Sequence, residues 1–119
     1  MSAPSVVIVE DDFLIAEHLK LICGDVGATV LDKLSSADGA AERILELAPD
    51  FALMDVRLGG KRDGVDVANA VHAANPDIRL VFITGSSEPP TVARIKEDHP
   101  FAILFKPISA ADLKEALGM

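Results

Sequence analysis

The stretch that decides the fold is Phe51-Ala52-Leu53-Met54-Asp55, in which four apolar residues run directly into one carboxylate. A short apolar run bounded by turn signals predicts a buried β-strand. Here Pro49-Asp50 precedes the run, and Gly59-Gly60 follows shortly after it. In open α/β sheets, ligands bind beyond the carboxyl ends of the strands. Asp55 stands at such an end, so it is the first candidate for the centre of a functional site.

On both sides of this stretch the chain alternates between strand and helix patterns. The predicted strands cover residues 6–9, 28–31, 51–55, 80–83 and 101–105. Between them, apolar residues spaced three and four apart predict amphipathic helices. Ser35 or Ser36 is expected to cap the second helix, and a short fourth helix is expected after Pro89-Pro90. Ser109-Ala110-Ala111-Asp112 has the pattern of a capping box at the start of the last helix.

Five alternations of strand and helix imply right-handed crossovers and a parallel sheet with helices on both faces. For five strands the common doubly wound order is 2-1-3-4-5. We therefore predict a flavodoxin-like α/β fold, a doubly wound five-stranded parallel sheet of order 2-1-3-4-5. The 119 residues fit one domain. The second strand is weakly apolar and runs directly into Asp32-Lys33, which suits an edge position.

The overall composition excludes several functions. Nineteen acidic residues stand against 11 basic ones, for a formal net charge of −8. This balance argues against direct binding to DNA or to anionic membranes, both of which need basic patches. No apolar run approaches the length of a membrane span, and Met1-Ser2-Ala3-Pro4 does not begin a signal peptide. Cys23 is the only cysteine, so an internal disulfide is impossible and a cytoplasmic location is expected.

Polar side chains follow four of the predicted strands: Asp11 and Asp12, Asp55, Thr84 and Lys106. Parallel strands place these ends on one rim of the sheet, and in the predicted order Asp12 and Asp55 should lie close together. At about 4 Å and an effective dielectric constant near 20, two carboxylates repel by roughly 4 kcal/mol. Protons or a cation must therefore occupy the rim. Mg²⁺ fits best, since it takes one or two carboxylates and keeps room for a phosphoryl oxygen.

The same rim carries groups suited to phosphoryl transfer. Asp55 is a candidate nucleophile, because carboxylates can form aspartyl-phosphates. The Lys106 ammonium can meet a phosphoryl oxygen, and the Thr84 hydroxyl can donate a hydrogen bond to one. Phosphoryl transfer depends mostly on positioning and charge neutralisation, and this rim supplies both.

Four motifs, in this order and each at a strand end, resemble those of the receiver domain of two-component response regulators. They are Val9-Glu10-Asp11-Asp12, Leu53-Met54-Asp55, Phe82-Ile83-Thr84-Gly85 and Phe105-Lys106-Pro107. The resemblance covers nearly the whole chain. It implies that Asp12 and Asp55, together with the backbone carbonyl of Arg57, hold Mg²⁺, with Asp11 assisting through water.

The resemblance also implies a function. Asp55 would accept a phosphoryl group from the phosphohistidine of a sensor histidine kinase or a histidine phosphotransfer protein. Thr84 and Lys106 would grip that group, and the Lys106-Pro107 bond would be cis. The protein would then act as a signalling module that switches its contacts with a downstream protein. Its only catalysis would be its own phosphorylation and dephosphorylation. A dimer through the fourth helix, fifth strand and fifth helix is a further expectation, as is a single receiver domain over residues 1–119 with no output domain.

The chain departs from the family pattern at two positions. Ile103 stands where the family usually has Tyr or Phe as an aromatic switch, and Gly59 stands where many members have Pro. Two rival functions are also open. A phosphohydrolase with an aspartyl-phosphate usually places an Asp-x-Asp pattern after the first strand, which Glu10-Asp11-Asp12 lacks. A flavin or nucleotide binder needs a phosphate-binding loop there, whereas this chain has three acids.

Overall fold

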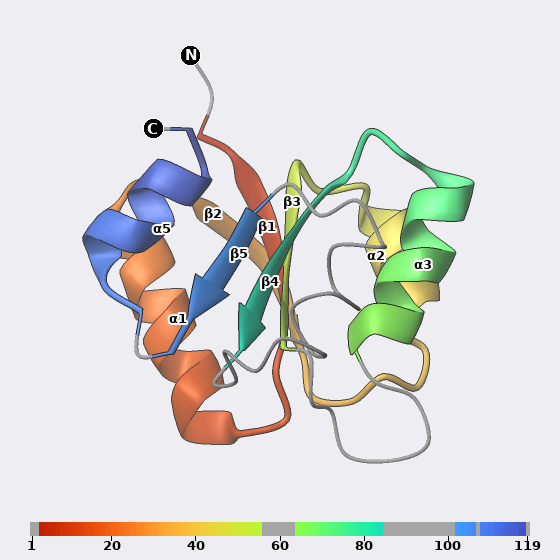
Figure 1. Cartoon of the computed structure of the whole chain (residues 1–119), viewed down its shortest axis with the longest axis horizontal. Helices are drawn as coiled ribbons and strands as arrows, with labels where there is room; N and C mark the ends of the chain where they lie inside the picture. The colour runs from red at the N-terminus through yellow and green to blue at the C-terminus, as the bar shows by residue number, and fades with distance from the viewer. Residues whose placement is uncertain (1–2, 56–63, 85–101, 107, 119) are drawn as a thin grey trace.

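The computed structural model describes residues 3–55, 64–84, 102–106 and 108–118. The described strands form one parallel sheet in the order β2-β1-β3-β4-β5, which confirms the predicted topology. Helices cover both faces of this sheet: α1 and α5 lie on one side of it, and α2 and α3 lie on the other (Figure 1).

The bounds of the elements lie close to those predicted. The strands are β1 (Ser5–Val9), β2 (Thr29–Leu34), β3 (Phe51–Asp55), β4 (Arg79–Thr84) and β5 (Ala102–Phe105). The helices are α1 (Phe13–Asp25), α2 (Ala40–Leu47), α3 (Gly64–Ala74) and α5 (Ala110–Ala116). The short helix expected after Pro89-Pro90 lies outside the described residues. In the part of the chain that the structure describes, no helix combines the length and the apolarity that a membrane crossing requires.

Strand β3 is the centre of the fold. It pairs with β1 on one side and with β4 on the other, and all five of its residues are buried. Successive side chains of a strand point to opposite faces, so Ala52 and Met54 pack against α2 and α3. Phe51 and Leu53 pack in the layer that contains α1 and α5. A strand covered on both faces must be apolar throughout, which explains the run that ends at Asp55.

The edge strand β2 contains one residue more than its partner. Val6 pairs with Val30, but Val7 pairs with Asp32, so Leu31 has no counterpart on β1. An extra residue of this kind is a β-bulge, and it reverses the alternation of faces along the strand. Val30 accordingly packs in the layer of α1, whereas Leu34 packs in the layer of α2. The strand was predicted to end at Leu31, but it continues past the bulge for three more residues, to Leu34.

The helix caps were predicted with mixed success. Ser109 and Asp112 form the expected capping box at the start of α5, each side chain accepting the other residue's backbone N–H. The capping role assigned to Ser35 or Ser36 was wrong. A turn intervenes, in which the Ala40 N–H donates to the Ala37 carbonyl, and Gly39 becomes the N-cap in the left-handed conformation at φ 74°.

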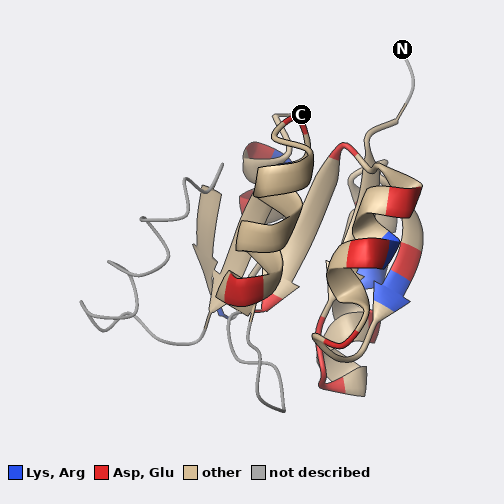
Figure 2. Ribbon diagram, turned by 90° about the vertical axis from the view of Figure 1, so that its right-hand side faces the viewer, with Lys and Arg blue, Asp and Glu red and all other residues tan. Residues whose placement is uncertain are grey.

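The charge of the described residues is distributed over the surface. Acidic residues are spread over several helices and loops instead of gathering in one patch, and Lys and Arg are fewer (Figure 2). Among the described residues, the buried charged side chains are Glu10 and Asp55, which lie at the carboxyl ends of the strands.

Candidate functional site

The carboxyl ends of β1, β3, β4 and β5 lie together at one rim of the sheet, as predicted. Among the described residues, the buried polar side chains are Glu10, Asp55 and Thr84, which follow or end β1, β3 and β4. Lys106 directly follows β5, and its backbone N–H donates to the Thr84 carbonyl at 2.8 Å, which continues the pairing of β5 with β4. The predicted residues Asp55, Thr84 and Lys106 thus lie at one edge of the sheet.

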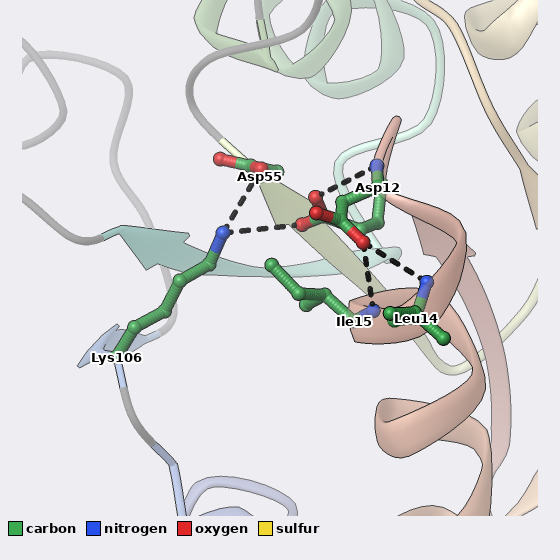
Figure 3. A network of polar contacts seen from close by, with 6 residues as sticks. Asp12, Leu14, Ile15, Asp55 and Lys106 are labelled. Atoms are coloured by element: carbon green, nitrogen blue, oxygen red, sulfur yellow. Dashed lines mark hydrogen bonds and ion pairs between the residues drawn. The ribbon is translucent and has the colours of Figure 1, made fainter.

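The ammonium of Lys106 lies between two carboxylates. Its Nζ is 3.1 Å from Asp55 Oδ2 (Figure 3) and 3.3 Å from Glu10 Oε2. Burial acts to lower the pKa of Lys106, but the hydrogen bond and the charge of Asp55, with those of Glu10, raise it overall. Lys106 therefore stays a cation and neutralises part of the acidic charge on the rim.

Of the described residues at the site, Glu10 has the most strongly shifted pKa. Its side chain is almost completely buried, and its backbone N–H donates to the Leu34 carbonyl at 2.9 Å, extending the pairing of β1 with β2. Burial raises the pKa of Glu10 from 4.5 to about 7, and its hydrogen bond with Asp55 contributes further in the same direction. Near neutral pH Glu10 is therefore partly protonated, and a cation beside it would offset its burial and its repulsion by the charge of Asp55.

Three acids together form a set that suits a metal ion. Glu10, Asp11 and Asp55 can each offer one carboxylate oxygen, and these oxygens lie within 4.8 Å of one another. Oxygen donors with an excess of negative charge fit a hard divalent cation such as Mg²⁺. Glu10 and Asp55 are buried while Asp11 is exposed, so the set faces solvent on the side of Asp11.

The structure differs from the prediction for Asp12. Its carboxylate is the N-cap of α1, where Oδ1 accepts from the N–H of Leu14 at 2.9 Å and from that of Ile15 at 3.2 Å (Figure 3). The acids gathered near Asp55 are instead Glu10 and Asp11. Asp12 begins a helix, and the first N–H groups of a helix need acceptors, for which Asp is among the preferred residues.

Glu10 is the residue that the sequence-based prediction missed. Two signals could have identified it. Glu10 directly follows the apolar run of β1, just as Asp55 ends the apolar run of β3. If Glu10 is the acid that faces the rim, Asp12 remains available to cap the predicted helix. The remaining predictions for this site cannot be compared, because Arg57 and the Lys106-Pro107 bond lie outside the described residues.

Comparison with known proteins identifies the family. The model of the response regulator receiver domain matches residues 6–118 of the chain. The chain therefore belongs to the response regulator receiver domain family. Domains of this family act in two-component signalling, where they interact with sensor kinases and downstream targets.

Curated relatives agree with this assignment. The transcriptional regulatory protein PdtaR of Mycobacterium tuberculosis is 30% identical over 114 residues, which cover 96% of this chain and 55% of that protein. The C4-dicarboxylate transport transcriptional regulatory protein DctD of Rhizobium meliloti is 28% identical over 118 residues, or 97% of this chain and 25% of that protein. The chain thus spans a quarter to about half of the length of these relatives.

Solved structures show the same fold. The signal receiver domain of a modulated diguanylate cyclase from Desulfovibrio desulfuricans G20 shares 36% identity at a TM-score of 0.89. This match covers 99% of the present chain and 93% of the other. A CheY-like receiver domain protein from Methanospirillum hungatei JF-1 has a TM-score of 0.87 at 23% identity, covering 98% and 92% of the two chains, and supports the fold alone.

Proposed function

We propose that this protein is a phosphoacceptor of a two-component or phosphorelay system, phosphorylated on Asp55 with the help of Mg²⁺. The observation that carries the proposal is the position of Asp55. Its carboxylate ends the central strand, lies 3.1 Å from the Lys106 ammonium and shares the rim with Glu10 and Asp11. A candidate nucleophile, an ammonium group and three acids that could hold a metal ion therefore lie together, which supports the proposal.

The transfer itself follows from these groups. A carboxylate oxygen of Asp55 attacks the phosphorus of a phosphohistidine, a new O–P bond forms, and the N–P bond breaks with its electron pair going to the imidazole nitrogen. Lys106 turns from Asp55 and Glu10 to an oxygen of the arriving phosphoryl group, and the Thr84 hydroxyl donates to another. Glu10, Asp11 and Asp55 would hold Mg²⁺, which supplies charge neutralisation at the phosphoryl oxygens.

The partners follow from this chemistry. A sensor histidine kinase or a histidine phosphotransfer protein supplies the phosphoryl group, and a downstream protein reads the phosphorylated state in the cytoplasm. The charge of −8 opposes direct contact of this chain with DNA. Ile103 is half-buried in the layer of α2 and α3, so any switch at this position works through an aliphatic side chain. A dimer through the fourth helix, β5 and α5 stays a prediction, and the expected fourth helix lies outside the described residues.

The test compares phosphate uptake by wild type and Asp55→Asn, using acetyl phosphate as a small phosphodonor with Mg²⁺. Asp77→Asn is the matched control, because Asp77 is exposed and lies in the turn before β4. Intact-mass measurement should show one added phosphoryl group on wild type and on Asp77→Asn, and none on Asp55→Asn. Equal uptake by all three proteins would remove Asp55 as the acceptor.

The same experiment separates the proposal from the rival phosphohydrolase. We propose that the protein is no enzyme beyond its own phosphorylation and dephosphorylation, so a general phosphoester such as p-nitrophenyl phosphate should not be turned over repeatedly. Many turnovers per protein, lost in Asp55→Asn, would favour the phosphohydrolase.

A further inference from the structure

Gly64, the first residue of α3, comes so close to the end of β3 that only glycine fits. A Cβ at this position would lie 2.1 Å from the carbonyl oxygen of Asp55 and 2.9 Å from its carbonyl carbon. It would also lie 2.8 Å from Cγ of Met54. Real Cβ atoms essentially never come within 3.0 Å of such neighbours. The glycine is therefore required by a close approach of two backbones.

The helix cannot easily withdraw from this contact. Four residues of α3 are buried in the same layer as Met54: Val65, Val67, Ala68 and Val71. Lifting the start of α3 would pull some of these apolar side chains out of a close-packed core. The resistance to any added side chain at Gly64 thus comes from the packing of the whole helix.

The Asp55 backbone is the other partner in this close approach. Asp55 is the last residue of β3, and its pairing within the sheet is with Ile83 of β4. On the other side, the pairing of β3 with β1 ends one residue earlier, at Met54. A side chain at Gly64 would have to open a 2.1 Å contact by roughly 1 Å, and the group on the other side of that contact is the Asp55 carbonyl.

We propose that Gly64 is a positioning residue for Asp55. Because Gly64 has no side chain, α3 can seat directly against the Asp55 peptide and fix where its short side chain starts. The carboxylate is then held at 3.1 Å from Lys106 Nζ. The effect on phosphorylation rests on the proposed function, whereas the effect on the position of Asp55 does not. A misplacement of about 1 Å can cost on the order of 10²-fold in rate.

The experiment compares Gly64→Ala with Gly24→Ala. Both changes add one methyl group to a helix, but a Cβ at Gly24 would meet nothing within 4 Å. We expect Gly24→Ala to keep the wild-type rate of phosphorylation by acetyl phosphate and the wild-type NMR signals of Asp55 and Lys106. Gly64→Ala should be slower by at least about tenfold. Its Asp55 amide and Lys106 Nζ signals should shift, while signals at the far end of α3, near His72, stay in place.

Two results would overturn the proposal. One is a folded Gly64→Ala with wild-type signals for Asp55 and Lys106 and with shifts along the length of α3, which would make Gly64 a packing residue only. The other result applies when Gly64→Ala does not fold, and it is measured on the wild-type protein. The wild-type protein is then titrated with Mg²⁺ alone, and the Gly64 amide must shift together with Asp55. A Gly64 signal that stays fixed while Asp55 responds contradicts the coupling.

The outcome is separable from that of the proposed function. If Asp55→Asn is phosphorylated as fast as wild type, Asp55 is not the acceptor, and the rates say nothing about Gly64. The NMR shifts of Asp55 and Lys106 in Gly64→Ala still decide whether this glycine positions the carboxylate.

Discussion

Two clusters of ion pairs in this molecule have similar distances, but one cluster is buried and the other is exposed. At the rim, Lys106 lies between the buried carboxylates of Glu10 and Asp55. On the surface, Arg43 of α2 pairs with Asp32 of β2 at 3.0 Å and with Glu46 at 3.1 Å. The distances are alike, but all three members of the surface cluster are more than 30% exposed, whereas Glu10 and Asp55 are below 10%.

The difference in burial separates the roles of the two clusters. Exposed ion pairs contribute little, because water and salt already stabilise each charge. Buried acids lose that hydration and depend on their partners, so removing one partner is costly. At the rim the fold therefore gives up stability to hold these acids together, whereas the Arg43 cluster only connects an edge strand to a helix.

The largest expected effect is a fall in stability with rising pH in metal-free protein. The folded-state pKa of Glu10 is about 7 against an ordinary value of 4.5. Between these values folded Glu10 keeps a proton that the unfolded chain has lost, so stability falls as pH rises from about 4.5 to about 7 and then levels off. The predicted loss is about 3 kcal/mol. Because the protein has no Trp or Tyr, urea unfolding is best followed by far-UV circular dichroism in the presence of EDTA.

Glu10→Gln provides the control for this prediction. The variant has no carboxylate at this position, so most of the slope over the same pH range should disappear. A slope equal to that of wild type would show that Glu10 is not the titrating group and would remove the contrast with the surface cluster.

The next effect is the cost of removing the central cation. Lys106→Met leaves Glu10 and Asp55 close together without a positive partner, and we expect a loss of about 2 kcal/mol at about pH 8. At about pH 5 the loss should be smaller, because protonated Glu10 no longer repels Asp55. Urea denaturation at the two pH values measures both quantities. A pH-independent loss would indicate that the methylene groups of Lys106 matter more than its charge.

A smaller effect is expected at Asp12, the exposed neighbour of the rim. Asp12→Ala removes an N-cap and should cost about 1 kcal/mol, whereas Asp12→Asn should cost little, because Asn caps equally well. Calorimetric titration with Mg²⁺ provides the second readout. Asp12→Asn should bind Mg²⁺ almost as wild type does, and Asp11→Asn should bind it more weakly. The reverse order of affinities would restore Asp12 as the metal ligand predicted from the sequence.

The smallest effect is expected for the surface cluster. The hydrogen bond to Asp32 raises the pKa of Arg43, but the pair is exposed, so Arg43→Met should shift the urea midpoint only slightly. The shift should shrink further at about 1 M NaCl, where charges are screened beyond about 3 Å. A midpoint change as large as that of Lys106→Met would mean that burial does not explain the difference between the two clusters.

Much of this arrangement could be predicted from the sequence. The apolar runs that end at Val9 and Asp55 are long enough to mark buried strands, and their alternation with helices fixed the strand order. The carboxyl ends of parallel strands must share one rim, so the proximity of Asp55, Thr84 and Lys106 followed from topology. Each of these predictions depends on a pattern several residues long.

The errors depend on single residues. Glu10, Asp11 and Asp12 are adjacent acids, and a shift of one residue at the end of β1 decides which of them turns toward Asp55 and which caps α1. Gly64 begins α3 and Asp55 ends β3, so their close approach cannot be predicted from any local sequence pattern. The turn that delays α2 to Ala40 follows from the hydrogen bond of Ala40 to Ala37, which the serines before it do not reveal.

The extra residue in β2 has a consequence for how the sheet sorts opposite charges. Because Leu31 shifts the phase of the strand, Asp32 falls on the face of α2, where Arg43 meets it, and Lys33 falls on the face of α1, where it pairs with Glu17. If the strand kept Leu31 but lacked the bulge, Leu31 would pair with Val7, Asp32 and Lys33 would exchange faces, and Lys33 would meet Arg43. The outermost strand would then carry like charges toward its neighbouring helix, and its straightened margin would be a better template for joining the sheet of another molecule.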